Sequence, residues 1–447
     1  MNAVVEPKSR YLSDFVERQQ EFPGNRSEWV RAARAAALAR FERLGFPGVR
    51  DEEWKYTNVG VIERHAYTPA PRAAGGIDVA ALRPLLFDGL ECDRLVFVDG
   101  HFAPTLSAVG KLPAGVTVGS LAAALEQDPD AVREFLGAQT RVDNNGFAAL
   151  NAAFMSDGAY LYLPPGAVLG RPVHVIHVST AAQDDVVTHV RNLLVAQADS
   201  QATVLETYAG LHDAAYLSNV QTEVVLGANA ALEHYKLQQE SDKARHVAAT
   251  CIHQHRGSRY ANYFISAGGR LVRNEIRPTL DGEGSECTLY GLCVLGGRQH
   301  VDNHTVVDHA RPQTTSREYY KSVLEGHARS VFSGKVIVHP DAQHTDAQQT
   351  NHNLLLSDDA EADTRPQLEI YADDVKCAHG ATVGQLDEEA LYYLKARGID
   401  DAAARNLLVY AFANDILNRL KIQPVRERLE QVLTTRLLHG RRIEDFL

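Results

Sequence analysis

The stretch from Ala159 to about Asp374 limits most strongly how this chain can fold. Apolar and polar residues alternate there in many short runs, such as Val173 to Val178 and Val331 to Val338. Such alternation is typical of β-strands. Turn sequences such as Gly227-Ala228-Asn229 separate the runs, with no helical pattern between them. Many strands without crossover helices argue against a doubly wound α/β sheet and leave a sandwich, a barrel or a β-solenoid.

The length of this strand region favours the β-solenoid. Coils of a solenoid stack one on the next, so the core grows linearly with chain length instead of needing one oversized interior. The chain of 447 residues is also too long for one ordinary core, which indicates either several domains or an elongated body with appendages. The sequence contains no clean short repeat, so periodicity alone leaves the three architectures open.

Helical patterns flank the strand region on both sides. One helix is predicted from Tyr11 to Gln20 and a second follows the N-cap residue Ser27. After Gly384, three more helices are predicted to begin at Asp387, Asp400 and Pro424. The sequence therefore predicts a mainly β protein with a mostly helical N-terminal region, a strand core and a C-terminal helical domain, with boundaries at 1–157, 158–378 and 379–447.

Charge and cysteine content narrow the compartment and the partners. The net charge of -12 argues against nucleic acid or an anionic membrane as the main partner, because both favour a basic surface. Met1 to Arg10 lacks the apolar run of an export signal, and no later run approaches the roughly 18 apolar residues of a membrane span. The five cysteines are widely spread without a C-x-x-C pair, which fits neither a disulfide framework nor a structural zinc site. We therefore expect a reducing cytoplasm.

A thiol and an imidazole lie two residues apart where the strand pattern gives way to helices. In an extended segment, residues i and i+2 point to the same side, so Cys377 and His379 would face one surface. Two flexible glycines, Gly380 and Gly384, follow them. The pair is a possible half-site for a soft metal, although a lone buried cysteine is more often a small hydrophobic residue.

Other candidate chemistry in the sequence is weaker. Histidine pairs on predicted strands lack partners of defined geometry, and we interpret them as solvent-facing or hydrogen-bonded; they are His174 with His177, His253 with His255, and His300 with His304. The chain contains no H-E-x-x-H, G-x-S-x-G, Walker A or G-x-G-x-x-G motif. The remaining enzymatic alternative is a β-solenoid enzyme acting on carbohydrate. The acidic residues of this chain, however, show no pairing that would indicate a catalytic site.

Long ungapped stretches resemble the signature of the SufB/SufD family of iron-sulfur cluster assembly proteins. They are residues 331–338, 342–351, 353–357 and 366–384, and the resemblance continues into the C-terminal helices. Leu44 to Pro47, Glu53 to Thr57 and the Cys-x-His-Gly-Ala-Thr segment are similar to the SufD branch of that family. A SufB-type paralogue stays as an alternative within the family.

The resemblance implies a right-handed parallel β-helix between helical ends and no catalytic activity for this chain alone. It implies a scaffold subunit that pairs with a SufB-like subunit through the β-helix and binds a SufC-like ABC ATPase through the C-terminal helices. ATP-driven closure of the ATPase would expose groups that receive a nascent cluster. In isolation a homodimer is expected to be possible, because a β-helix presents open edges.

The same resemblance assigns roles to individual residues. Cys377 and His379 match positions at the interface with SufB and become candidate ligands for transient iron or for a transient cluster shared with that subunit. No cofactor is then expected to be bound tightly by this chain alone. An incomplete ligand set on each chain suits a site that must release its cargo. The expected surface for the ATPase consists of Tyr392, Tyr393, Leu394 and Arg397.

Overall fold

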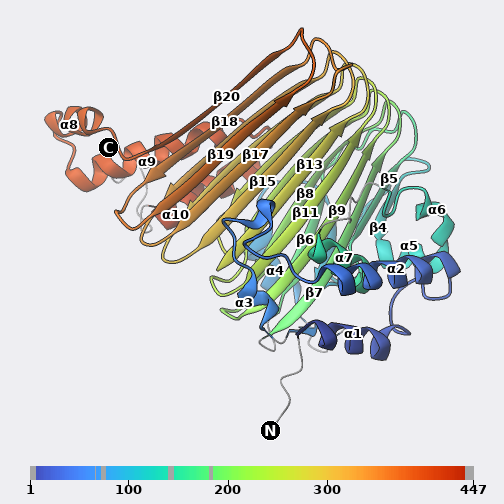
Figure 1. Cartoon of the computed structure of the whole chain (residues 1–447). Helices are drawn as coiled ribbons and strands as arrows, with labels where there is room; N and C mark the ends of the chain where they lie inside the picture. The colour runs from blue at the N-terminus through green and yellow to red at the C-terminus, as the bar shows by residue number, and fades with distance from the viewer. Residues whose placement is uncertain (1–6, 66, 72–76, 139–144, 181–184, 438–447) are drawn as a thin grey trace.

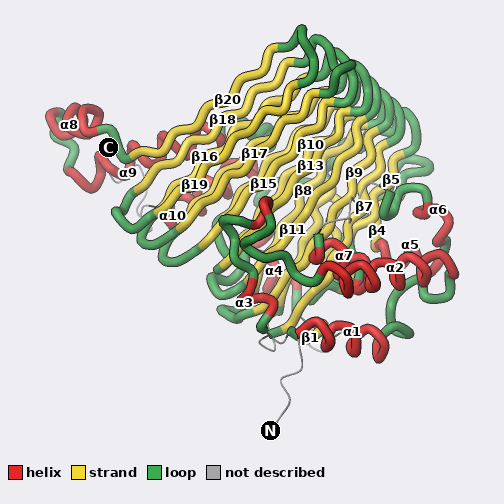
Figure 2. The backbone as a smooth tube through the Cα atoms, viewed as in Figure 1, coloured by secondary structure: helices red, strands yellow, loops and turns green. Residues whose placement is uncertain are grey.

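A computed structural model describes residues 7–65, 67–71, 77–138, 145–180 and 185–437. Residues 1–6 and 438–447 lie outside these ranges. The expectations for the segment from Met1 to Arg10 and for the helical domain 379–447 rest partly on these residues. Figures 1 and 2 show a long stack of strands with helices at both ends of the chain. The prediction of a mainly β protein flanked by helical regions is confirmed.

The strands form a parallel β-solenoid of about seven turns. From β5 onward, consecutive strands alternate between two ten-stranded sheets, and each strand from β7 to β18 pairs with the strand one coil before and the strand one coil after it. One sheet contains β1 (Thr68–Pro69), β4 (Thr117–Ser120), β5 (Ala159–Leu163), β7 (Val186–Ala196), β9 (Tyr216–Leu226), β11 (Arg245–Gln254), β13 (Leu271–Leu280), β15 (His300–His309), β17 (Arg329–Val338) and β19 (Glu361–Ile370). The other contains β2 (Asp93–Val98), β3 (His101–Phe102), β6 (Val173–Ser179), β8 (Gln201–Gly210), β10 (Ala231–Gln239), β12 (Arg259–Ser266), β14 (Glu286–Leu295), β16 (Thr315–Leu324), β18 (Asp346–Leu355) and β20 (Lys376–Gly384).

The strands stay in register because equivalent positions of successive coils carry compatible residues. Inside the coils, apolar side chains at equivalent positions stack into one continuous core, as in the column formed by Ala202, Leu232, Tyr260 and Cys287. The turns between strands recur at equivalent places and use residues that tolerate a left-handed backbone, such as Asn229 at φ 58° and Gly257 at φ 65°. Regular turns and a shared core therefore give the coils a similar shape without an exact sequence repeat.

The N-terminal helices pack against the first coils. Helices α1 (Pro7–Arg18), α2 (Glu28–Leu44) and α7 (Gly146–Phe154) share an aromatic cluster that includes Tyr11, Phe41 and Phe154. The shorter helices are α3 (Gly60–Glu63), α4 (Val79–Leu82), α5 (Leu121–Gln127) and α6 (Pro129–Arg133), with 3-10 turns η1 (Glu52–Trp54) and η2 (Arg83–Leu85). Helices α3, α5, α6 and α7 cover the N-terminal end of the sheet that contains β5, β7 and β9 (Figure 1). Helix α4 packs on β2 and β6 of the other sheet.

The segment around Trp54 anchors the N-terminal region further along the solenoid. The Trp54 ring is 3% exposed and lies 4.4 Å from the guanidinium of Arg273 on β13. Thr57 donates a 2.5 Å hydrogen bond to Asp302 on β15. The segment thereby ties together strands from separate coils.

The C-terminal helices are α8 (Glu388–Ala396), α9 (Asp401–Leu417) and α10 (Gln423–Leu437). The apolar sides of α9 and α10 pack on the outer face of the sheet that contains β14 and β16, with Ile416 and Leu429 fully buried there. Asp415 of α9 accepts a 2.6 Å hydrogen bond from Tyr319 and forms a 2.9 Å ion pair with Lys321. Helix α8, in contrast, projects away from the solenoid (Figure 1).

The two sheets extend beyond the expected strand core of residues 158–378. Strands β2, β3 and β4 lie within residues 1–157 and join the two sheets, and β20 runs to Gly384, so the expected boundary between residues 378 and 379 falls inside a strand. The reason is that Gly380 and Gly384 still pair with β18, although glycine usually weakens a strand. Within the described ranges, every helix is too short or too polar to cross a membrane.

Candidate functional site

The two ends of the solenoid are finished differently. At the N-terminal end, β3 pairs antiparallel with β2 and β4 pairs antiparallel with β5, and helices cover the adjoining coils. At the C-terminal end, β19 and β20 are the outermost strands, and within the described residues no further strand pairs with either. The last coil therefore presents one open edge in each sheet.

Cys377 and His379 lie on β20, at this open end. Their register partners in the coil below are Ala347 and Gln349, which are 0% and 1% exposed because they point into the solenoid. Cys377 and His379 thus occupy inward-facing columns, as their spacing predicted. Cys377 is half-buried against the apolar interior, whereas His379 is exposed, because no further coil covers it.

The environment of Cys377 keeps its thiol protonated. Partial burial raises the pKa of Cys377 above its ordinary value, and the nearby Asp346 carboxylate raises it further, while the backbone N–H of Ala347 opposes the shift. A protonated thiol is a poor metal ligand, so binding of a soft metal has to displace this proton.

A polar column continues inward below His379. Gln349 Nε2 donates a 2.9 Å hydrogen bond to Oε1 of Glu318, and Thr305 Oγ1 donates one of 2.5 Å to Oε2 of the same carboxyl group. Burial raises the pKa of Glu318 to about 7. The Gln349 side chain needs the space beside Gly334, where an added Cβ would lie 2.2 Å from Nε2.

Sequence reasoning missed Glu318 and Gln349 as neighbours of the candidate site. Both lie in the column that ends at His379, because β16, β18 and β20 pair in register. The available signal was the unbroken run of polar residues from Gln348 to Asn353 in the β18 segment, which places polar groups on both faces of the strand. That signal could not show which of these side chains point inward.

The described part of the chain offers two soft donors at the open end. Within it, no three or more histidine, cysteine or acidic side chains are grouped so that they could hold a metal ion. The expected ligands Cys377 and His379 therefore supply one sulfur and one nitrogen donor, and a four-coordinate site would need further donors.

The histidine pairs noted in the sequence have other surroundings. His174 is buried and its Nε2 lies 2.9 Å from Thr207 Oγ1, and His177 is buried between the rings of Phe97 and Tyr208. His300 Nε2 lies 3.0 Å from Thr57 Oγ1.

The residues expected to bind the ATPase lie on α8 or at its C-terminus. Tyr392 and Tyr393 are 75% and 55% exposed, although large aromatic side chains usually seek burial. The Arg397 guanidinium stacks 3.5 Å from the centre of the Tyr393 ring. Leu394 is half-buried, and Leu391 is the buried residue that anchors the helix.

Comparison with known proteins assigns the fold to a family. Residues 5–175 match the SufBD protein N-terminal region, and residues 177–412 match the SufBD core domain of the SUF system for FeS cluster assembly. An iron-sulfur cluster assembly SufBD family protein of Synechocystis is 33% identical over 403 residues, covering 88% of each chain. The iron-sulfur cluster assembly protein SufD of Escherichia coli is 31% identical over 409 residues, covering 91% of this chain and 92% of the relative. The SufD protein of Bacillus subtilis is 27% identical over 439 residues, covering 95% and 96%.

These matches span nearly the whole chain. The chain belongs to the SufBD family of iron-sulfur cluster assembly proteins, as a SufD-type member. The family resemblance seen in the sequence is thereby confirmed.

Proposed function

We propose that this chain is a non-catalytic scaffold subunit of a cytoplasmic iron-sulfur assembly complex. It pairs with a SufB-like subunit, binds a SufC-like ABC ATPase and supports iron acquisition and assembly of a nascent cluster. The observation that carries the proposal is the placement of Cys377 and His379 on the last coil, in inward-facing columns that no further coil covers. The five free cysteines fit a reducing compartment.

The open end fits a partner of the same architecture. Unpaired backbone groups along β19 and β20 can pair with the edge strands of a second solenoid, which would continue both sheets across the junction. Exposed apolar residues at the rim, such as Ile370 at 39% and Tyr371 at 62%, would be buried there. Cys377 and His379 would then lie between two subunits, where the SufB-like subunit can complete the ligand shell of a transient cluster. The same edges allow a homodimer when that subunit is absent.

The cluster is cargo in this proposal. A half-buried thiol and an exposed imidazole hold iron less firmly than a closed four-cysteine site, which suits release to a recipient. Helix α8, with its exposed Tyr392, Tyr393 and Arg397, is the proposed docking surface for the ATPase. Because α9 and α10 are packed on the solenoid, movement of the ATPase would be transmitted to the coils.

The test of the cluster site is reconstitution with the SufB-like and SufC-like partners, followed by iron and sulfide analysis. We expect His379→Ala and Cys377→Ser to lower the bound iron and sulfide severalfold while the complex still assembles. His212→Ala is the matched control, because His212 is also exposed but lies in a turn near the N-terminal end. Unchanged cluster content in both site variants would refute the assignment.

The docking surface is tested separately with the SufC-like ATPase alone. Tyr392→Ala combined with Tyr393→Ala should weaken binding at least about tenfold, as loss of aromatic anchor residues does at other interfaces. Tyr371→Ala removes an equally exposed tyrosine outside the helices and should leave binding unchanged. If the wild-type protein, the double tyrosine variant and Tyr371→Ala bind the ATPase equally well, the ATPase docks elsewhere.

A further inference from the structure

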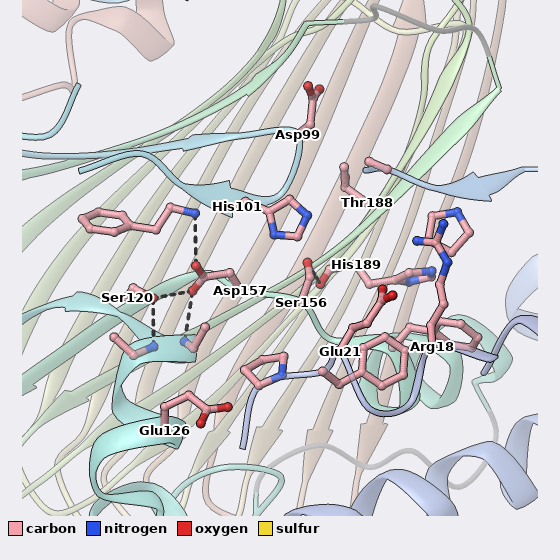
Figure 3. A pocket seen from close by; sticks show the side chains of 18 of the residues that line it. Arg18, Glu21, Asp99, His101, Ser120, Glu126, Ser156, Asp157, Thr188 and His189 are labelled. Atoms are coloured by element: carbon pink, nitrogen blue, oxygen red, sulfur yellow. Dashed lines mark hydrogen bonds between the residues drawn. The ribbon is translucent and has the colours of Figure 1, made fainter. Parts of the chain in front are cut away.

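A cavity of about 830 Å³ lies at the other end of the solenoid from Cys377 and His379. Its lining residues come from the N-terminal helical layer and the first coils, on α1, β1, β3, β4, α5, α7 and β7 and the chain between them (Figure 3). The proposed scaffold function does not use this cavity. Its wall combines an apolar part and an acidic part.

The apolar part of the wall is built from phenyl rings and aliphatic side chains. They belong to Phe22, Pro69, Phe102, Phe154 and Val187. A volume of this size with such walls is typical of sites for small organic molecules. Aromatic rings also attract an organic cation that lies over their π-faces.

The acidic part of the wall outweighs its basic groups. Four carboxylates line the cavity, against one guanidinium, that of Arg18; they belong to Glu21, Asp99, Glu126 and Asp157. Burial lowers the pKa of His189, one of two histidines in the wall, to about 3, so its ring is neutral. Even with the other histidine, His101, protonated, the acids would outnumber the cations by two. The cavity therefore favours a positively charged ligand.

Asp157 is a buried anion without a counter-ion beside it. Its side chain is 6% exposed, and Oδ1 accepts hydrogen bonds from Ser120 Oγ at 2.8 Å and from the backbone N–H of Ala122 at 3.0 Å (Figure 3). Oδ1 also accepts one from the backbone N–H of Gly158 at 2.8 Å, and Oδ2 accepts one from that of Phe102 at 3.1 Å. Because all four partners are donors, the carboxyl group is ionised.

The surroundings of Asp157 stabilise its charge through hydrogen bonds alone. Burial raises the pKa of Asp157, the four hydrogen bonds oppose this shift, and no charged group of the protein contributes to it. A buried charge that has no cation beside it attracts one more strongly than a charge in water does.

Glu21 and Glu126 supply carboxylate oxygens where the cavity opens to solvent, since both side chains are exposed. Glu126 Oε1 accepts a 2.6 Å hydrogen bond from the backbone N–H of Gly24, which ties the chain that follows α1 to α5. This bond leaves Glu126 Oε2 available to a ligand. Asp99, in contrast, already accepts hydrogen bonds from the backbone N–H of Thr180 at 2.9 Å and from its hydroxyl at 2.6 Å.

We propose that this cavity binds an organic ammonium cation with an apolar body. The body lies against the phenyl rings and aliphatic side chains, and the ammonium group donates hydrogen bonds to the carboxylates of Glu21 and Glu126, attracted also by the charge of Asp157. A metal ion fits less well, because no three histidine, cysteine or acidic side chains in the described ranges are grouped to hold one. An anion is repelled by the same carboxylates.

The probe that tests this site is 1-naphthylmethylamine, compared with 1-naphthylmethanol and 1-naphthoate. The three molecules share the naphthalene ring and differ in charge. Ligand-observed NMR titrations of the full chain at neutral pH and low salt should give a dissociation constant of about 1 mM or lower for the amine, the strength expected of a small fragment. The alcohol and the carboxylate should bind at least about tenfold more weakly. No binding of the amine, or equal binding of the alcohol, would overturn the proposal.

A pair of charge variants separates this site from the overall negative charge of the chain. Glu21→Gln combined with Glu126→Gln should weaken amine binding about fivefold, because it removes two charges but keeps an oxygen for the N–H of Gly24. Glu28→Gln combined with Glu42→Gln, on the exposed side of α2 and outside the cavity, makes the same change in net charge and should leave binding unchanged. Equal effects of the two double variants would overturn the proposal.

A second variant tests the cavity itself. Ala123→Phe narrows it from the exposed side of α5 and should weaken binding of the amine at least about tenfold. Ala80→Phe, on the exposed side of α4 and outside the cavity, is the matched control and should bind as the wild-type protein does. Amine binding that survives Ala123→Phe unchanged would refute the site.

Discussion

The closed N-terminal end of the solenoid and its open C-terminal end use the same coil geometry to opposite effect. Near the closed end, Arg191 on β7 and Glu223 on β9 are 2% and 0% exposed and form a 2.5 Å ion pair. At the open end, Cys377 is half-buried and His379 is exposed, although both occupy columns that are buried in the coil below. Coverage by a further layer thus decides whether a polar residue stabilises the fold or stays available to a partner.

The largest expected effect breaks the buried pair near the closed end. Arg191→Met leaves the Glu223 carboxylate buried without its cation, which should lower the free energy of unfolding by about 3–5 kcal/mol. Arg365→Met, at the open end, removes an ion pair with Glu52 whose side chains are 29% and 70% exposed, and should cost less than about 1 kcal/mol. Chemical denaturation of both variants measures the difference, and equal losses would show that the two ends are not distinct.

The pH dependence of stability tests the covered part of the column below His379. The folded protein holds the Glu318 proton up to about pH 7, against an ordinary pKa of 4.5. Its contribution to stability is therefore complete below about pH 4.5 and is lost as the pH rises through about 7, by about 3 kcal/mol. Glu318→Gln should remove this part of the pH dependence and stabilise the protein at pH 8. If the free energy of unfolding changes between pH 5 and 8 by the same amount in Glu318→Gln as in the wild-type protein, this account is contradicted.

Two glycines sharpen the contrast between covered and open positions. Gly334→Ala brings a methyl group within 2.2 Å of Gln349 Nε2 and should destabilise the protein by about 1–3 kcal/mol. Gly380→Ala meets no atom within 4 Å and should change stability by less than about 0.5 kcal/mol. Thermal unfolding measures the stability of both variants. If Gly380→Ala loses more stability than Gly334→Ala, the terminal coil is covered.

The smallest expected effect concerns the thiol at the open end. Because burial raises the pKa of Cys377, metal binding at neutral pH must release its proton, and affinity should rise up to about tenfold per pH unit. Cobalt titration of the assembled complex, followed by the thiolate-to-cobalt absorption band, measures this dependence. Cys377→Ser should abolish the band, and a pH-independent affinity in the wild-type protein would indicate that the thiol does not bind the metal.

The candidate site was predictable only in part. The spacing of Cys377 and His379 was enough to place both on one side of a strand, because side chains alternate along any extended segment. It could not place Gln349 and Glu318 beneath them, since that requires the pairing of strands one and two coils away. The cavity near the N-terminal end gave no signal in the sequence, because its lining residues come from seven separate helices and strands.

The sequence by itself determined the strands, the flanking helices and the family, because periodicity and contiguous signature residues are local properties. The tertiary structure alone decided that the strands divide between two sheets, that one end is closed by helices and the other is open, and that a cavity forms where the two regions meet. These features depend on contacts between residues far apart in the chain, such as Trp54 with Arg273 and Tyr319 with Asp415. Such contacts follow from stacking and packing, which no local pattern records.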